Sequence, residues 1–472
     1  MKSAADGALG RSVRGAVDGA RNTAALGWWG IVRLGLVQTC LGAIIVLTTS
    51  TLNRIMVVEL ALPAMLPGFL VGLHHAVQML RPRFGHGSDV GGRTTGWIVG
   101  GMLVLALSGT LAAVGTALAE TRLLAGVALC VLAFFGIGLG AGASGTSLLV
   151  TLAKHVAPER KAPAATIVWI MMIAGFAVTA GTAGHFLDPY SSLRLVQVTG
   201  CVGLIAMVVT LVAVYRLEPY GDGASKQQPV PDGHRDFRGA LREVWGEPEA
   251  RRFTLFVFIS MLAYSAQDLI LEPFAGMLFG MTPGESTQLA GIQHGGVLLG
   301  MLAVAFGGYL LRGNGPAVLR LWTVGGCLAS AVALAGIALG GMAAPHWPLA
   351  GNVFLLGVAN GAFAVAAIAS MMTLAGRGAA RREGLRMGLW GAAQAIAFAL
   401  GGFTGTVAID VSRALINDPA LAYAIVFSLE ATLFVVAAAI GLRVRDSAQH
   451  DNNGQEVPSF GKIAMAEVLD AR

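Results

Sequence analysis

Long apolar runs alternate with short polar segments along almost the whole chain. A helix needs about 20 predominantly apolar residues to cross the roughly 30 Å hydrocarbon core of a bilayer. Runs of this length predict twelve membrane-spanning helices, at residues 34–53, 60–80, 96–118, 123–150, 164–187, 195–215, 253–279, 288–311, 317–341, 347–375, 386–409 and 420–442. The pattern therefore predicts an all-α integral membrane protein.

The interval between the sixth and seventh runs differs from the other connections. Residues 216–252 contain four prolines and many charged side chains, which is typical of a hydrophilic linker. This linker divides the chain into two six-helix halves, at 34–215 and 253–442. The remaining residues, 1–33 and 443–472, are predicted to form the N-terminal and C-terminal tails.

Lysine and arginine are distributed unequally between the two faces of the predicted bundle. The face that receives both tails and the linker has 28 of the 32 basic residues, and the opposite face has 4. Because basic residues are retained on the cytoplasmic side, this distribution predicts that both termini and the linker are cytoplasmic. The net charge of +6 then reflects topology, and it indicates no binding of nucleic acid.

Composition supports the membrane interpretation and argues against catalysis. The chain is 55% hydrophobic and only 12% charged, which excludes an ordinary soluble protein. Each of the four cysteines stands alone within an apolar run, so neither a disulfide framework nor a zinc site is indicated. The sequence has no phosphate-binding loop and no Ser-His-Asp spacing, so we expect a protein that is not an enzyme.

The loop between the second and third runs contains a motif with a defined spacing. Glycines permit a tight reversal, and an aspartate and an arginine can bridge neighbouring helix ends. The motif consists of Gly85, Asp89, Gly92 and Arg93. This spacing, together with the two halves and the central linker, resembles the major facilitator superfamily. Val90 and Thr94 stand where that family usually has further basic residues.

Three further stretches resemble a narrower family. They are Leu52–Leu60 (LNRIMVVEL), Gly72–Gln78 (GLHHAVQ) and Gln267–Phe274 (QDLILEPF). Together they are similar to the PucC/LhaA branch, the light-harvesting assembly proteins of purple phototrophs. The short loop at Arg83–His86 is more similar to LhaA-type members than to PucC proper.

The resemblance implies a function and its partners. A member of this branch is expected to bind bacteriochlorophyll and to deliver it to the polypeptides of the core antenna complex (LH1), with a carotenoid as a further candidate pigment. It implies contact with antenna polypeptides, the reaction centre, pigment-synthesis enzymes and the protein-insertion machinery. The expected location is the bacterial inner (intracytoplasmic) membrane. No metal is implied other than the magnesium within the pigment.

Three histidines are candidate pigment ligands. The central magnesium of a chlorin takes a fifth ligand, for which an imidazole nitrogen is suitable. His294 lies between glycines in Gly291–Gly296, so we expect either a pigment ligand or a hydrogen bond to a neighbouring helix. His74 and His75 are consecutive, and consecutive helical residues point about 100° apart. We therefore expect that they do not share one groove, and that one can bind pigment while the other forms a hydrogen bond or faces a polar cavity.

Two acidic residues in the seventh run are the other candidates. Asp268 and Glu272 are four residues apart, so they share a helix face, and Pro273 favours a kink directly after them. Intramembrane carboxylates are costly and usually functional. They could form a pigment site, fix the first helix against the seventh, or couple protons in a secondary transporter of an organic solute. An ion pair of Arg54 with Glu59 or with Glu272 is also expected.

Overall fold

The computed structural model describes residues 26–81, 84, 94–157, 160–217, 245–310, 316–375 and 383–443. These residues are helical and include no β-strand. Within them, eleven helices are long and apolar enough to cross a membrane, and the shorter apolar helix Met65–Leu80 completes the predicted set of twelve. The predicted all-α membrane architecture is thereby confirmed.

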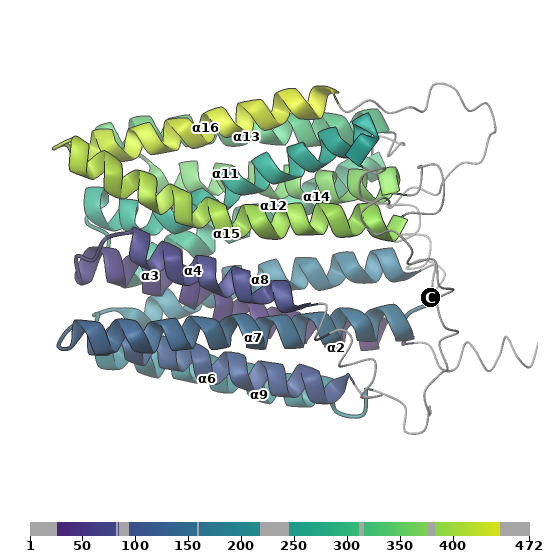
Figure 1. Cartoon of the computed structure of the whole chain (residues 1–472), viewed down its shortest axis with the longest axis horizontal. Helices are drawn as coiled ribbons and strands as arrows, with labels where there is room; N and C mark the ends of the chain where they lie inside the picture. Colours follow the sequence, from purple (N-terminus) through teal and green to yellow (C-terminus); the bar gives the residue numbers. More distant parts are fainter. Residues whose placement is uncertain are drawn as a thin grey trace, which may run out of the picture.

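The helices run side by side in two groups, which correspond to the two halves (Figure 1). The first half consists of α2 (Trp28–Val46), η1 (Leu47–Thr51), α3 (Leu52–Arg54), η2 (Ile55–Glu59), α4 (Met65–Val77), η3 (Gln78–Leu80), α6 (Thr95–Ala119), α7 (Leu123–His155), α8 (Lys161–Leu187) and α9 (Ser192–Val214). The second half consists of α11 (Pro248–Phe279), α12 (Pro283–Leu310), α13 (Pro316–Met342), α14 (Leu349–Ala375), α15 (Glu383–Leu415) and α16 (Pro419–Arg443).

Each half has its own apolar core. Ile31, Leu34 and Phe134 belong to the cluster in the first half. Phe274 and Trp390 belong to the cluster in the second half. The halves meet mainly along two helix pairs, in which α8 packs against α12 and α4 packs against α15. These two interfaces position the candidate residues described below.

The first helix is longer than its apolar run predicts. It continues from α2 through η1, α3 and η2 to Glu59, and η1 and η2 are π-helical segments, which occur frequently at functional sites. The predicted run ends at residue 53, but the helix continues beyond it, and Asn53 and Arg54 are both buried inside it. The helix can include them because Asn53 binds a backbone carbonyl of the other half and Arg54 pairs with Glu59.

Helices α11 and α12 also begin earlier than predicted. Helix α11 starts at Pro248, inside the predicted linker, because proline is well tolerated in the first turn of a helix. Helix α12 starts at Pro283 because Thr282 and Glu285 form a capping box. The Glu285 N–H donates to Thr282 Oγ1 at 3.1 Å, and the Thr282 N–H donates to Glu285 Oε2 at 2.8 Å. His294 therefore lies about three turns into its helix, rather than near the start.

The predicted loop motif lies outside the described residues. This applies to Gly85, Asp89, Gly92 and Arg93, as well as to most of the linker and of both tails. A bridging role for the motif remains a prediction.

Candidate functional site

His294 faces the interface between the two halves and is well prepared to act as a ligand. Its side chain is 7% exposed, and its Nδ1 lies 2.8 Å from the carbonyl oxygen of Ala290, one turn earlier. When Nδ1–H donates to this carbonyl, the lone pair of Nε2 is left available, which is the usual arrangement of a histidine ligand. Phe176 of α8 contacts the imidazole edge-on, with ring centroids 5.0 Å apart.

The glycines around His294 do not all serve the same purpose. A Cβ at Gly291 would lie 2.8 Å from the nitrogen of Gly181, and one at Gly296 would lie 2.3 Å from the carbonyl oxygen of Phe354. These two glycines therefore permit close helix packing. Gly295 is different, because a Cβ there would have no neighbouring atom within 4 Å. The open space beside the imidazole is thus at Gly295.

That open space belongs to an apolar face of α12. Ile292 and Leu299 lie three residues before and four residues after Gly295, and their side chains are 40% and 49% exposed. Exposed apolar side chains on a membrane-spanning helix face lipid. Gly295, the residue directly after His294, therefore lies on an apolar surface adjacent to the lipid phase, where a flat hydrophobic ring has room.

His74 and His75 lie closer together than expected. Their rings are stacked with centroids 4.4 Å apart and an interplanar angle of 18°. The prediction that they cannot share a groove is wrong, because rotation about the side-chain bonds brings the rings together although the Cα–Cβ bonds diverge. The two histidines thus form a single aromatic unit at the end of α4.

The two histidines differ in access. His74 is 1% exposed and its Nε2 is 2.5 Å from the side-chain nitrogen of Gln78, while its Nδ1 is buried with no hydrogen-bond partner among the described residues. His75 is half-buried and contacts Phe398 of α15 at 5.6 Å, so it lies between the halves. Of the two histidines, His75 is the better placed to bind a ligand, and the ring of His74 stacks against the ring of His75.

Asp268 and Glu272 have separate environments on α11. Asp268 Oδ1 accepts a hydrogen bond of 3.2 Å from the side chain of Gln293, the residue directly before His294. Glu272 is 2% exposed, and neither of its carboxyl oxygens has a hydrogen-bond partner among the described residues, although Ser50, Ser286 and Arg54 lie close to it. Asp268 is therefore connected to the His294 region, and Glu272 is not.

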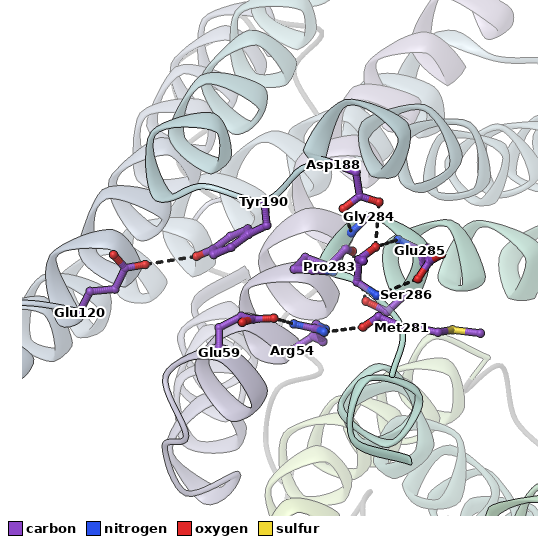
Figure 2. A network of polar contacts seen from close by, with 11 residues as sticks. Arg54, Glu59, Glu120, Asp188, Tyr190, Met281, Pro283, Gly284, Glu285 and Ser286 are labelled. Atoms are coloured by element: carbon purple, nitrogen blue, oxygen red, sulfur yellow. Dashed lines mark hydrogen bonds and ion pairs between the residues drawn. The ribbon is translucent and has the colours of Figure 1, made fainter. Parts of the chain in front are cut away.

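Arg54 joins the first helix to the second half. It forms an ion pair with Glu59, and its Nη2 donates to the carbonyl oxygen of Met281 at 2.6 Å (Figure 2). Of the two ion pairs expected for Arg54, the structure contains the one with Glu59. The neighbouring Asn53 donates to the carbonyl oxygen of Leu269 at 2.5 Å. This hydrogen bond fixes the first helix against α11, a role expected of the α11 carboxylates.

Asp188 forms a further connection between the halves that the sequence did not reveal. It follows the last residue of α8 and accepts hydrogen bonds from Thr282 Oγ1 at 2.8 Å and from the Gly284 N–H at 3.3 Å (Figure 2). Both donors belong to the start of α12 in the other half. The Asp188 carboxylate therefore caps a helix across the interface.

Asp410 forms a similar connection at the second interface. Its two carboxyl oxygens accept from the backbone N–H groups of Ala64 at 2.9 Å and Met65 at 2.7 Å, where α4 begins. The described hydrogen bonds between the halves gather toward this end of the bundle, away from the central linker. The halves are thus joined by polar contacts at one end.

Two solved transporter structures are similar to this chain in fold. The nucleoside transporter NupG aligns with a TM-score of 0.62 and 14% identity over 88% of this chain and 98% of that chain. A bacterial homologue of the human lysosomal transporter Spinster, in an inward-facing and occupied conformation, aligns with a TM-score of 0.60 and 16% identity over 88% of this chain and 96% of that chain. The likeness shows the major facilitator fold, as predicted.

Within that fold class, the sequence identifies the family. Residues 51–449 match the family model described as PUCC protein, and the chain belongs to this family. The "Bacteriochlorophyll synthase 44.5 kDa chain" of Rhodobacter capsulatus is 54% identical over 88% of this chain and 94% of that protein. "Protein PucC" of the same organism is 27% identical over 87% of this chain and 91% of that protein. This difference does not test the expectation of an LhaA-type member rather than PucC proper, which stays a prediction.

Proposed function

We propose that this protein is a non-enzymatic assembly factor for the core light-harvesting antenna, which binds bacteriochlorophyll and passes it to antenna polypeptides. Membership of the PucC family supports the link to antenna complexes. The name of the relative that is 54% identical, a bacteriochlorophyll synthase chain, supports the link to the pigment. The observation that carries the proposal is the geometry of His294.

The geometry of His294 suits a chlorin. The hydrogen bond to Ala290 fixes the imidazole tautomer, so Nε2 offers its lone pair to the central magnesium. Gly295 leaves room for the macrocycle on the apolar face of α12, and Phe176 supports the ring of the histidine. A ligand bound at this position can leave sideways into lipid, where single-span antenna polypeptides are located.

The proposal also includes a second ligand position, a membrane orientation and a set of partners. His75 offers a second ligand position between α4 and α15, and the apolar surface accommodates a carotenoid. The asymmetry of basic residues supports cytoplasmic termini in the bacterial inner (intracytoplasmic) membrane. The proposed partners are the antenna polypeptides, the reaction centre, pigment-synthesis enzymes and the protein-insertion machinery.

A proton-coupled transporter of an organic solute is the second candidate function. The major facilitator fold and the buried carboxylates Asp268 and Glu272 favour it. It differs from the first candidate in requiring a solute flux driven by a proton gradient, whereas a pigment-binding assembly factor requires neither.

The first test measures bound pigment. Protein purified from native membranes in mild detergent should show bacteriochlorophyll absorbance, and His294→Leu should reduce the pigment-to-protein ratio severalfold. His185→Leu is a matched control, because His185 also lies on an interface helix, α8, but its side chain is exposed. Equal pigment content in a folded His294→Leu protein and the parent would remove His294 as the ligand. Absence of pigment from the parent protein would contradict the proposed function itself.

A further inference from the structure

Glu430 is a buried acidic residue that the proposed function does not use. It lies near the middle of α16, is 2% exposed, and neither of its carboxyl oxygens has a hydrogen-bond partner among the described residues. Phe427 and Phe434 lie on the same face of α16, one turn to either side of it. An ionised carboxylate in this position, in the interior of a membrane protein, would be strongly destabilising.

Ring contacts place Glu430 at the depth of Asp268. Phe427 contacts Phe274 of α11, with centroids 5.0 Å apart, and Phe434 contacts Phe363 of α14 at 5.6 Å. Phe363 also contacts Tyr264 of α11 at 6.4 Å. Glu430 is therefore flanked on α11 by Phe274 on one side and Tyr264 on the other, and Asp268 lies between them. In agreement, Glu430 and Asp268 interact electrostatically.

The surrounding residues at this depth are polar and incompletely paired. Asn360 precedes Phe363 by one turn of α14, and its Oδ1 accepts from Ser330 of α13 at 2.8 Å, while its Nδ2 is buried without a partner. Gln267 is fully buried, and neither its Nε2 nor its Oε1 has a partner among the described residues. A layer of polar side chains thus crosses the second half, with donors and acceptors left unused.

The charge of this layer comes mainly from the two carboxyl groups. Asp268 is stabilised by a neutral donor, Gln293. The described titratable side chains on helices packed against α16 are Glu249, Arg251, Arg252, Tyr264, Asp268 and Glu272 on α11, Arg320 and Cys327 on α13, and Asp410 and Arg413 on α15. Of the carboxyl groups among them, Asp268 is the one at the depth of Glu430. Two neighbouring carboxylates in a poorly solvated interior cannot both remain ionised.

We propose that Glu430 and Asp268 form a proton-binding site, in which the pair holds one proton between α16 and α11 at neutral pH. The proton comes from water, resides on Glu430, and leaves Asp268 as the acceptor of the Gln293 hydrogen bond. The unused polar atoms of Gln267 and Asn360 face the same layer and can stabilise the protonated state through bound water. This site shares Asp268 with the hydrogen bond to Gln293 beside His294, but its test does not require bound pigment.

Infrared spectroscopy of the purified protein tests the site directly. A protonated carboxyl group gives a C=O stretch that shifts in deuterium oxide, whereas the ester and ketone carbonyls of any bound pigment do not shift. At neutral pH the parent should show this deuterium-sensitive band, and Glu430→Gln should remove the component whose frequency changes in Asp268→Asn. In Asp268→Asn the band should persist at a changed frequency, because Glu430 keeps its proton but loses its acidic neighbour.

One further variant and one change of salt complete the test. Glu272→Gln is the matched control, because Glu272 is equally buried and lacks a partner but lies on a different contact. Loss of the band in Glu272→Gln instead of Glu430→Gln would overturn the assignment. If Glu430→Gln does not fold, an unchanged band frequency in Asp268→Asn would also overturn the assignment of the proton to Glu430. A band that disappears when sodium replaces potassium would identify a sodium site and overturn the proton site. Failure to detect the band in the parent would overturn it outright, whatever the pigment content.

Discussion

Asp188 and Asp410 hold equivalent positions in the two halves. Asp188 follows α8 and accepts from the Gly284 N–H at the start of α12, and Asp410 in α15 accepts from the Ala64 N–H at the start of α4. In both cases a carboxylate approaches the positive end of a helix in the other half, where it is electrostatically favourable. The two caps therefore close the same end of the bundle on both interfaces.

The equivalence extends one turn further along each helix pair. Four residues before Asp188, a Cβ at Gly184 would lie 2.6 Å from the carbonyl oxygen of Gly284. Four residues before Asp410, Thr406 is so close to α4 that a Cβ at Gly68 would lie 2.0 Å from its hydroxyl oxygen. Each interface therefore combines an acidic cap with a close approach that a glycine permits.

The first prediction concerns the two caps. Asp188→Ala and Asp410→Ala should each lower stability by about 1 kcal/mol, the usual effect of removing a helix cap. Thermal unfolding in detergent measures this effect. Asp418→Ala is the matched control, because Asp418 accepts from the Ala420 N–H of its own helix. Spin labels on the two halves should show a broader distance distribution at this end in the double variant but not in the control. An unchanged distribution would mean that the caps do not hold the halves together.

The second prediction concerns Gly284. A Cβ there would lie 2.3 Å from Asp188 Oδ2 and 2.4 Å from the carbonyl oxygen of Gly184, and the backbone oxygen cannot move easily. Gly284→Ala should therefore destabilise the protein by about 1–3 kcal/mol. At Gly351 a Cβ would meet no atom within 4 Å, so Gly351→Ala in α14 should be neutral or slightly stabilising. Equal melting temperatures for the two variants would contradict the close contact.

The third prediction concerns the space beside His294. Gly295→Leu should place a side chain where the pigment macrocycle would lie, so the pigment-to-protein ratio should fall severalfold without loss of thermal stability. Gly325→Leu is the control, because Gly325 in α13 also has no atom within 4 Å of its Cβ position but is remote in sequence from His294. Normal pigment content in Gly295→Leu would place the pigment elsewhere on the protein.

The helical architecture could be predicted from hydropathy because each span must satisfy its own backbone hydrogen bonds in lipid. Helix ends were harder to predict, since polar residues such as Arg54 entered a helix once a partner in the other half was available. The start of α12 is a different case. Its capping box at Thr282 and Glu285 is visible in the sequence and gives the correct first turn.

The candidate site was only partly predictable. His294 was identified by its glycine neighbours, but only the structure shows that Gly295 alone leaves open space. The stacking of His74 on His75 depends on side-chain torsions that spacing does not determine. The cap formed by Asp188 joins residues 96 positions apart, and no local pattern indicates such a contact.

The last prediction separates an assembly factor from a transporter. The two carboxyl groups have different surroundings: Asp268 accepts a hydrogen bond from Gln293 next to His294, and Glu272 lies near Arg54 between the halves. In an assembly factor, Asp268→Asn with Glu272→Gln should lower core-antenna absorbance in membranes. Glu120→Gln serves as the control, because Glu120 is exposed at the end of α6. In a proton-coupled transporter, the double variant should lose uptake of a solute into membrane vesicles while antenna absorbance stays normal. Normal antenna absorbance together with loss of a proton-driven flux would exclude the assembly function and establish transport.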